Sequence, residues 1–332
     1  YRGVADGSVE YIRRNSVDLW VLQDNATNIL RGSSLISADQ INAIARAPGV
    51  RTAAPVLFLL STIRKGDKVK TVFLTGFEPD KGLGGPPLLV RGRGPRADDE
   101  IVLDRSFALK FGFEVGEEVD LQGHRLRIVG ISGGTNAFVI QYAFVTLRFA
   151  RRLIGFPGLA TCVLVKVEPG AGTGPAREEI CEVLAGLMAY DQETFLANNV
   201  REMRSGFLPL LYTVAIIGAV VLTAILSLLL SVNILERRKD FAILKTLGSP
   251  IAFLWGMVIK QALLIASVSC AAALVLFFPL VRVIERISPE VTTISTAGQI
   301  GGVAGAVLLM SLASSLVAIR RLRRIYFLEA FS

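Results

Sequence analysis

The segment ERRKDFAILKTLGSP, residues 236–250, lies between two of the most apolar stretches of the chain. It is strongly charged and patterned like a helix, and Gly248 and Pro250 supply stop signals at its end. Its apolar residues recur at near-helical spacing while its cations tend toward the remaining surface: Phe241, Ile243, Leu244 and Leu247 against Arg238, Lys239 and Lys245. The pattern predicts a short helix over residues 236–248 at a membrane surface. It leaves open whether that helix only joins two spans or is bound by another protein.

The composition of the chain indicates a membrane protein. Of its 332 residues, 52% are hydrophobic and 19% are charged, and the mean hydropathy is +0.53. Soluble domains are typically about a quarter charged. Up to residue 206 the chain has 25 Lys and Arg against 23 Asp and Glu, whereas from residue 207 onward it has 11 against 5. A soluble-type region therefore precedes a membrane-type region.

Three apolar runs reach the length of about 20 residues that a spanning helix needs. They cover residues 207–234, 251–278 and 296–319. Because short cytosolic loops are enriched in Lys and Arg, the segment 236–250 and the Arg-rich tail 320–332 are expected in the cytosol. The loop between the second and third runs balances its charges and is expected outside. The soluble-type region is then expected in the periplasm, beyond the inner membrane.

The start of the chain, YRGVADGS, carries no signal peptide and no apolar anchor. A periplasmic domain must be exported by some such signal. We therefore expect a first spanning helix upstream of Tyr1, absent from this sequence. The three spans seen here would then belong to a set of four, with both ends of the protein in the cytosol.

The first part of the soluble-type region alternates strand and helix patterns. The run VDLWVLQ, residues 17–23, alternates as a strand does, and Ser37 with Gln40 has the spacing of a capping box before a helix that ends at Pro48 and Gly49. Strands are predicted at about residues 51–64 and 68–77, with a turn between them. Residues 82–96, rich in Gly, Pro and Arg, are expected to form a surface loop.

The second part continues the same mixture of elements. The run EIVLD predicts a strand, RSFALKFG a helix closed by Gly112, and EEVDLQGHRLRIVGI a hairpin that turns at Gln122 and Gly123. Residues 175–188 are expected to form a helix. These patterns predict an α+β domain in two lobes over residues 1–190. Residues 191–206 are expected to form a stalk helix leading to the first span, and Pro209 leaves its continuity open.

Residues that could carry catalysis or bind metal are few. His124 is the single histidine and is expected to be a solvated turn residue, because no second His or Cys cluster accompanies it. Cys162, Cys181 and Cys270 share no metal spacing; Cys162 and Cys181 could pair, but a role in the core is favoured. The carboxylates Asp98, Asp99, Glu100, Glu117 and Glu118 are expected on solvated loops and hairpin faces. No catalytic residue, metal or cofactor is therefore assigned.

The sequence argues against two further functions, ATP hydrolysis and nucleic-acid binding. The chain contains no G-x-x-x-x-G-K-[ST] phosphate loop, so it does not itself hydrolyse ATP. Its basic surplus lies next to the spans, where orientation in the membrane explains it without nucleic acid.

Lys260 is the one cation within a span; its long side chain is expected to reach the cytosolic surface as an anchor, with a functional role as the alternative.

Several stretches resemble MacB/FtsX-like ABC transporter permeases. In ERRKDFAILKTLGSP the order of an acidic residue, a small-apolar pair, a basic residue and Leu-Gly is similar to the signature after the second membrane helix of that family, although Asp240 stands where Glu is more usual. VDLWVLQDNATNIL, GVRTAAPV and VLDRSFALKFGFEVGEEVDLQGHRLRIVGI resemble the extracytoplasmic core domain, especially in the DevC branch of exporter permeases. The ending IYFLEAF resembles the family's closing motif, but Tyr326 and Phe327 replace its Asp and Pro.

The resemblance implies a mechanism called mechanotransmission. A cytosolic ABC ATPase binds two permease copies, ATP-driven closure moves the helix of residues 236–248, and the motion reaches the periplasmic domain, which acts on a membrane-fusion adaptor, an outer-membrane channel and a lipid, glycolipid or other amphipathic cargo. The residues that the resemblance assigns to ATPase coupling are Glu236, Arg237, Arg238, Asp240, Phe241, Ile243, Leu244, Lys245, Leu247 and Gly248.

The sequence leaves three alternative functions open. The same scaffold could be a signalling regulator that activates a cell-wall hydrolase, which the size of the outer domain disfavours. It could also be a permease that extracts lipoproteins. A membrane-anchored enzyme is the least favoured, because the sequence offers no catalytic constellation. The cargo itself is not identified by the sequence.

Overall fold

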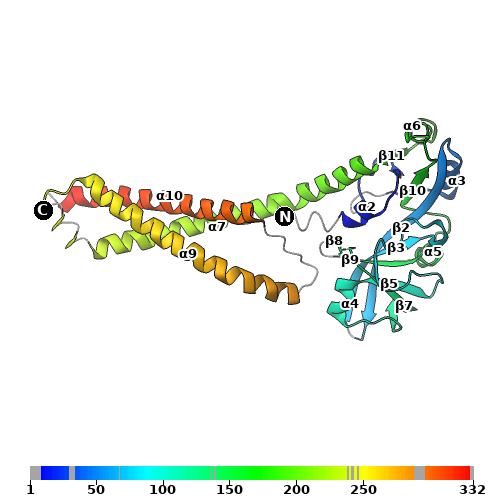
Figure 1. Ribbon diagram of the computed structural model, residues 1–332, viewed down its shortest axis with the longest axis horizontal. Coiled ribbons are helices and arrows are strands. Elements are labelled where there is room, and N and C mark those ends of the chain that lie inside the picture. The colour runs from blue at the N-terminus through cyan, green and yellow to red at the C-terminus, as the bar shows by residue number, and fades with distance from the viewer. Residues whose placement is uncertain are drawn as a thin grey trace. The chain divides into compact units, whose positions relative to one another are not determined.

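The computed structural model describes residues 9–29, 34–66, 68–134, 136–137, 140–237, 239–240, 243–244, 247–287 and 296–329. The chain divides into two compact units, and the boundary between them falls after Gly206. The first unit contains the β-sheet and the short helices, and the second contains long apolar helices (Figure 1).

The first unit is built on one sheet whose main path is β11-β1-β10-β2-β3-β9-β5-β7-β4, with β6 paired to β2 and β7 and with β8 paired to β9. The strands on the main path are β11 (Leu187–Asp191), β1 (Leu19–Gln23), β10 (Cys162–Val167), β2 (Val50–Lys65), β3 (Lys68–Phe77), β9 (Ile140–Thr146), β5 (Glu100–Asp104), β7 (His124–Ser132) and β4 (Leu89–Gly92). The two others are β6 (Glu118–Leu121) and β8 (Asn136–Ala137). The pairs β3–β9 and β5–β7 are parallel and the remaining pairs are antiparallel.

The long strand β2 joins two lobes. Its first half pairs with β10, with Ala54 opposite Leu164, and its second half pairs with β3, with Leu59 opposite Leu74. The first lobe therefore holds β11, β1 and β10, and the second holds the strands from β3 to β4. This is the α+β domain in two lobes that the sequence predicts.

The first lobe is buried on both faces of its sheet. Leu19 and Val21 of β1 face one cluster, with α3 (Ala38–Arg46), α6 (Gly174–Glu178) and the π-helix η2 (Glu179–Val183). Trp20 and Leu22, which alternate with them, face the other cluster. There α2 (Glu10–Arg14) contributes Tyr11, and the first turns of α7 (Gln192–Glu236) contribute Phe195. Burial on both faces explains the almost continuous apolar run of β1.

The second lobe has its own core. The helices α4 (Arg105–Phe111) and α5 (Leu147–Ile154) cover the sheet with Phe107, Ala108, Leu147 and Phe149, which are all buried. At Gly76 of β3 a Cβ atom would lie 2.4 Å from the Cβ of Ala150, so glycine is what lets α5 lie so close to the strand. The short 3₁₀-helix η1 (Pro79–Lys81) follows β3.

Several local predictions are confirmed. Ser37 and Gln40 form a capping box at the start of α3. Gly112 ends α4 with φ +65°, as predicted, and the structure adds a cap that was not predicted, in which Asp104 accepts the Ser106 amide at 2.8 Å. The hairpin of β6 and β7 turns at Gln122 and Gly123, both with positive φ as a tight hairpin turn requires.

Two expectations for this unit are wrong in part. The helix expected over residues 175–188 ends at Val183, because Gly186 turns with φ +78° and Leu187–Asp191 pairs with β1 as the edge strand β11. The loop expected over residues 82–96 contains β4, which pairs with β7. In both places a free sheet edge supplies hydrogen-bond partners that local patterning does not reveal.

The second unit consists of α7 from Phe207 onward, α9 (Ile251–Ile287) up to Val283, and α10 (Ala297–Glu329). Each contains a stretch long and apolar enough to cross a membrane. α7 is one helix over Gln192–Glu236 with Pro209 inside it, and α10 continues past residue 319 into the Arg-rich tail. Their mutual packing is limited, because between 6% and 17% of the most apolar window of each helix is buried.

Candidate functional site

The segment predicted to couple to an ATPase lies between α7 and α9. Glu236 ends α7, Arg237 donates its amide to the Asn233 carbonyl at 3.2 Å, and residues 239–240 and 243–244 are helical. The Leu247 amide bonds to the Ile243 carbonyl at 3.1 Å, and the Ser249 amide to the Leu244 carbonyl at 3.1 Å. Gly248, with φ +88°, lies within this pattern of bonds, which is typical of a glycine-terminated helix. Gly248 thus ends the helical segment in the place that the stop signal predicts.

The apolar residues of this segment do not share one environment. Leu244 packs against a cluster formed by Leu230, Ile234, Leu254, Val258, Ala262 and Ile319. Ile243 is 58% exposed and Leu247 is 77% exposed, and the neighbouring Asp240 is also exposed. Arg238, Phe241 and Lys245 lie outside the described residues. Leu244 therefore attaches the segment to the bundle, while Ile243 and Leu247 leave an apolar surface among charges.

Hydroxyl groups connect the helices of the bundle. The Ser311 hydroxyl of α10 donates to the Ala262 carbonyl of α9 at 2.9 Å, and the Ser314 hydroxyl donates to the Thr223 carbonyl of α7 at 3.1 Å. The buried Ser227 hydroxyl of α7 has no hydrogen-bond partner among the described residues. Small polar side chains at such positions let helix backbones approach closely in a membrane.

Lys260 of α9 has no ion-pair partner among the described residues, and its side chain is exposed. An exposed lysine near one end of a span can extend along the lipid to the headgroup region. The anchor role remains the prediction for this residue.

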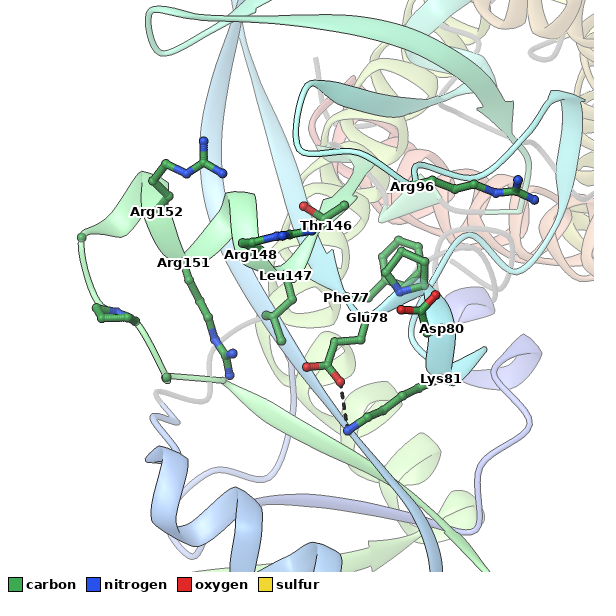
Figure 2. A pocket seen from close by; sticks show the side chains of 14 residues that line it. Phe77, Glu78, Asp80, Lys81, Arg96, Thr146, Leu147, Arg148, Arg151 and Arg152 are labelled. Atoms are coloured by element: carbon green, nitrogen blue, oxygen red, sulfur yellow. Dashed lines mark ion pairs between the residues drawn. The ribbon is translucent and has the colours of Figure 1, made fainter.

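The first unit contains a cleft of about 1230 Å³ beside α5, at the end of β3 (Figure 2). Its lining residues are Phe77, Glu78, Pro79, Asp80, Lys81, Arg96, Thr146, Leu147, Arg148, Arg151, Arg152, Gly155, Pro157 and Gly158. Five of these are cations and two are carboxylates. We call this site the basic cleft.

Helix α5 supplies three of the arginines. The Thr146 hydroxyl caps α5 by accepting the Phe149 amide at 3.2 Å and donates to Asp98 at 2.6 Å. Arg148 and Arg152, one turn apart, both pair with the same Asp98, with 3.2 Å from the Arg148 Nε. Asp98 is therefore not a solvated loop residue, as was expected, but an anchor for two arginines.

Three other charged residues of the basic cleft, Arg151, Lys81 and Glu78, make hydrogen bonds or ion pairs. The Arg151 Nε donates to the Leu159 carbonyl at 2.8 Å, and burial lowers the pKa of Arg151. The Lys81 Nζ bonds to the Ala53 carbonyl at 2.7 Å and pairs with Glu78 at 2.9 Å. Nothing in the local sequence pattern marks these residues as a site, because they come from β3, η1, α5 and the loop before β5.

The other candidate carboxylates also have structural roles. Glu100 is buried, binds Arg93 through both of its oxygens, and accepts the Arg96 amide at 2.9 Å. The Arg93 hydrogen bonds outweigh burial and lower the pKa of Glu100 to about 2. The expectation of a solvated position is thus wrong for Glu100. Glu117 is exposed and pairs with Lys65 at 3.4 Å.

The remaining candidates fit no catalytic or metal centre. His124 is exposed at the start of β7 and its ring lies 5.6 Å from that of Phe149. Cys162, Cys181 and Cys270 are free thiols; Cys162 is buried in β10, and the amide of Ala189 donates to the Cys181 sulfur at 3.3 Å. Within the described part of the chain, no three His, Cys, Asp or Glu residues are grouped so that they could hold a metal.

Both parts of the chain match known protein families. Residues 3–183 match the MacB-like periplasmic core domain, and residues 212–327 match the FtsX-like permease C-terminal region. An uncharacterized ABC transporter permease of Mycobacterium tuberculosis is 26% identical over 263 residues, which cover 78% of this chain and 70% of the relative. One of Mycobacterium bovis is 26% identical over 251 residues, or 75% of this chain and 67% of the relative.

Two solved structures are also similar to the chain. The periplasmic region of MacB from Actinobacillus actinomycetemcomitans matches with 15% identity and a TM-score of 0.44, covering 59% of this chain and 96% of that one. The extracellular domain of the transporter YknZ from Gram-positive bacteria matches with 14% identity and a TM-score of 0.41, covering 53% and 99%.

Proposed function

Because this chain belongs to the family of ABC transporter permeases that join a MacB-like periplasmic core domain to an FtsX-like C-terminal region, we propose that it works by mechanotransmission. It is a multi-pass inner-membrane protein with its α+β unit in the periplasm, and such a permease implies an ATPase partner. In the proposal, ATP hydrolysis by that separate cytosolic subunit moves residues 236–248. The motion drives export of an amphipathic cargo, a lipid or glycolipid, without a tunnel through the bilayer.

The exposed apolar pair Ile243 and Leu247 is the observation that carries the proposal. A leucine that is 77% exposed at a helix end, beside charged residues, is suited to entering a pocket of another protein. Leu244 of the same segment packs against residues of α7, α9 and α10. A force applied to Leu247 would therefore be passed to the bundle through Leu244.

Helix α7 supports the second half of the proposal. Its first turn is fixed to the α+β unit, because the Trp20 Nε1 donates to the Gln192 Oε1 at 2.7 Å and the Trp20 ring stacks on Phe195. Asn199 accepts the Ile29 amide at 3.1 Å. Near its other end, Leu230 and Ile234 pack in the bundle. A single helix with both ends held can pass a displacement along its axis.

The partners follow from the same proposal. A second copy of the permease would cover part of the large apolar surface that the three spanning helices leave exposed, and the bilayer would cover the rest. A membrane-fusion adaptor and an outer-membrane channel would act beyond the periplasmic domain. The proposed division is residues 1–190 for that domain, 191–206 for the stalk and 207–332 for the membrane region with its cytosolic tail.

The decisive experiment replaces Leu247 with Asp in the full permease, reconstituted with its cytosolic ATPase partner. Removing an apolar hot-spot contact costs about 2 kcal/mol, so the ATPase should bind the variant at least about tenfold more weakly. Permease-dependent stimulation of ATP hydrolysis should fall in parallel. The matched control is Leu109→Asp on α4, which also replaces an exposed leucine, 65% exposed, but in the periplasmic unit.

Unchanged binding and stimulation in Leu247→Asp, and likewise in Ile243→Asp, would reduce the segment to a tether and refute the coupling role. Purification of the intact permease from membranes provides a second readout. An adaptor in the purified complex supports export. A cell-wall hydrolase in its place would instead support the signalling alternative, and a lipoprotein would support lipoprotein extraction.

A further inference from the structure

The basic cleft continues into a second, less polar groove. The groove, of about 600 Å³, shares Phe77, Pro79 and Arg96 with the cleft. Its other lining residues are Arg14, Asn15, Ser16, Gly82, Leu83, Gly85, Pro86, Pro87, Leu89, Gly94, Pro95 and Lys166. The two depressions therefore adjoin at these residues; the cleft has the larger share of cations, and the groove has the larger share of apolar side chains.

The arginines of the cleft keep hydrogen-bond donors free for a ligand. A guanidinium carries five N–H donors in a planar fork. Asp98 pairs with both Arg148 and Arg152, yet the two side chains remain 78% and 57% exposed. The Arg96 side chain has no ion-pair or hydrogen-bond partner among the described residues. Even with Glu78, Asp80 and Asp98 counted, the five cations leave a positive surplus.

Two of the three cations that line the groove, Arg14 and Lys166, are paired with carboxylates, which leaves its apolar lining as the main feature. Arg14 pairs with Glu10 at 2.7 Å, and Lys166 pairs with Asp18 at 3.2 Å. Leu83, Pro86, Pro87, Leu89 and Pro95 line it, and the three consecutive residues Leu88, Leu89 and Val90 are each at least 40% exposed. Three exposed apolar residues in a row at the start of the edge strand β4 are unusual for a soluble surface.

We propose that the cleft and groove together bind one lipid with a phosphate-bearing headgroup. The headgroup phosphate lies against Arg148 and Arg152, which Asp98 holds together, because guanidinium forks match phosphate oxygens in pairs. Arg96, which lines both depressions, adds positive charge where they adjoin. The acyl chain lies along Leu83 and Leu89, where burial of methylene groups needs no hydrogen-bond partner. This inference rests on the proposed function in one respect: it identifies the amphipathic cargo as an anionic lipid.

The charge complementarity selects this ligand over a neutral glycolipid or a free phosphate ester. A neutral headgroup would leave the arginine donors without a charged acceptor. A free phosphate ester would leave the apolar groove exposed to water. The lipid occupies both the basic cleft and the groove.

The test uses the full chain in a non-ionic amphipol, titrated calorimetrically with dodecyl phosphate, inorganic phosphate and dodecyl maltoside. Dodecyl phosphate should bind most tightly. The double variant Arg148→Gln, Arg152→Gln should bind it about tenfold more weakly, and Arg96→Gln should weaken it severalfold. The matched control Arg46→Gln, Arg51→Gln removes two exposed arginines of the first lobe that line neither depression, and it should bind as the wild type does.

A second variant tests the groove. Leu89→Asn should weaken dodecyl phosphate severalfold and leave the weak binding of inorganic phosphate unchanged. Because Arg96 and Leu89 are exposed, both variants should unfold at the wild-type temperature, which separates lost binding from lost folding.

Equal affinity for inorganic phosphate and dodecyl phosphate would contradict the assignment of a lipid ligand. Equal affinity for dodecyl maltoside and dodecyl phosphate would contradict the assignment of an anionic headgroup. Arginine-dependent binding of an acidic peptide that is tighter than that of dodecyl phosphate would assign the cleft to a protein partner instead. Failure here is distinguishable from failure of the proposed function. If dodecyl phosphate does not bind but Leu247→Asp uncouples the ATPase, only the cargo site is refuted; the reverse result refutes the coupling and keeps the site.

Discussion

The α+β unit and the helix bundle are stabilised in opposite ways. In the first unit, Trp20, Tyr11 and Phe144 are almost completely buried in a cluster of aromatic rings. The buried carboxylate of Glu100 accepts hydrogen bonds through both of its oxygens. In the second, the described residues form one small apolar cluster and two hydroxyl hydrogen bonds between helices, and most of their side chains face outward. The periplasmic unit carries its own core, whereas the described part of the bundle buries few side chains within itself. Substitutions should therefore be far more costly in the first unit.

The largest effect is expected from Trp20→Ala. The side chain is completely buried, stacks on Phe195 at 4.7 Å and donates to Gln192, so its removal leaves a cavity and an unpaired amide. Unfolding of the periplasmic unit should lose about 4 kcal/mol, measured by urea denaturation of the full chain in detergent. In the bundle, Val275→Ala, at a residue 74% exposed, should change stability by less than about 0.5 kcal/mol. Similar losses from both would erase the contrast between the units.

Gly76→Ala should come next. The new Cβ would lie 2.4 Å from the Cβ of Ala150, which the backbone of α5 holds in place, so the helix must move away from β3. We expect a loss of about 3 kcal/mol and a lower unfolding temperature, followed by circular dichroism. Gly94→Ala is the control, because a Cβ there meets no atom within 4 Å. An unchanged unfolding temperature for Gly76→Ala would mean that α5 packs less tightly than described.

Glu100 should make the periplasmic unit less stable at acid pH. Its folded-state pKa is about 2, below the ordinary value of 4.5, so the unfolded state binds more protons between these values. The stabilisation is complete above about pH 5 and is lost as the pH falls toward 2. Glu100→Gln should cost about 2 kcal/mol at neutral pH, because the Arg93 partner is half exposed.

The same variant should also flatten the decline of stability with acid. Urea denaturation at neutral pH and at pH 3 measures both effects. A decline in Glu100→Gln as steep as in the wild type would assign the acid sensitivity to other carboxylates.

The smallest effect is expected within the bundle. Ser314→Ala removes the bond from its hydroxyl to the Thr223 carbonyl and should cost about 0.6 kcal/mol. Ser227→Ala removes a buried hydroxyl that has no partner among the described residues, and it should be neutral or slightly stabilising. Unfolding in sodium dodecyl sulfate measures both. A larger loss from Ser227→Ala than from Ser314→Ala would reveal a partner for that hydroxyl.

The sequence by itself determined the features that depend on neighbouring residues. The capping box at Ser37, the hairpin turn at Gln122 and Gly123, and the helix end at Gly248 each rest on a few adjacent residues. The three spanning helices follow from apolar length alone. Local hydrogen bonding and hydropathy are written in consecutive residues, so single-chain patterns suffice for them.

Only the tertiary structure decided which distant residues meet. Residues 187–191 form a strand because β1 offers a free edge, and Glu100 is buried because Arg93 and two amides surround it. The basic cleft combines α5, η1, β3 and the loop before β5, and the outward position of Leu247 depends on Leu244 packing against three helices. Such contacts join residues far apart in the chain, whose pairing is set by the closure of the sheet and the packing of helices rather than by any local pattern.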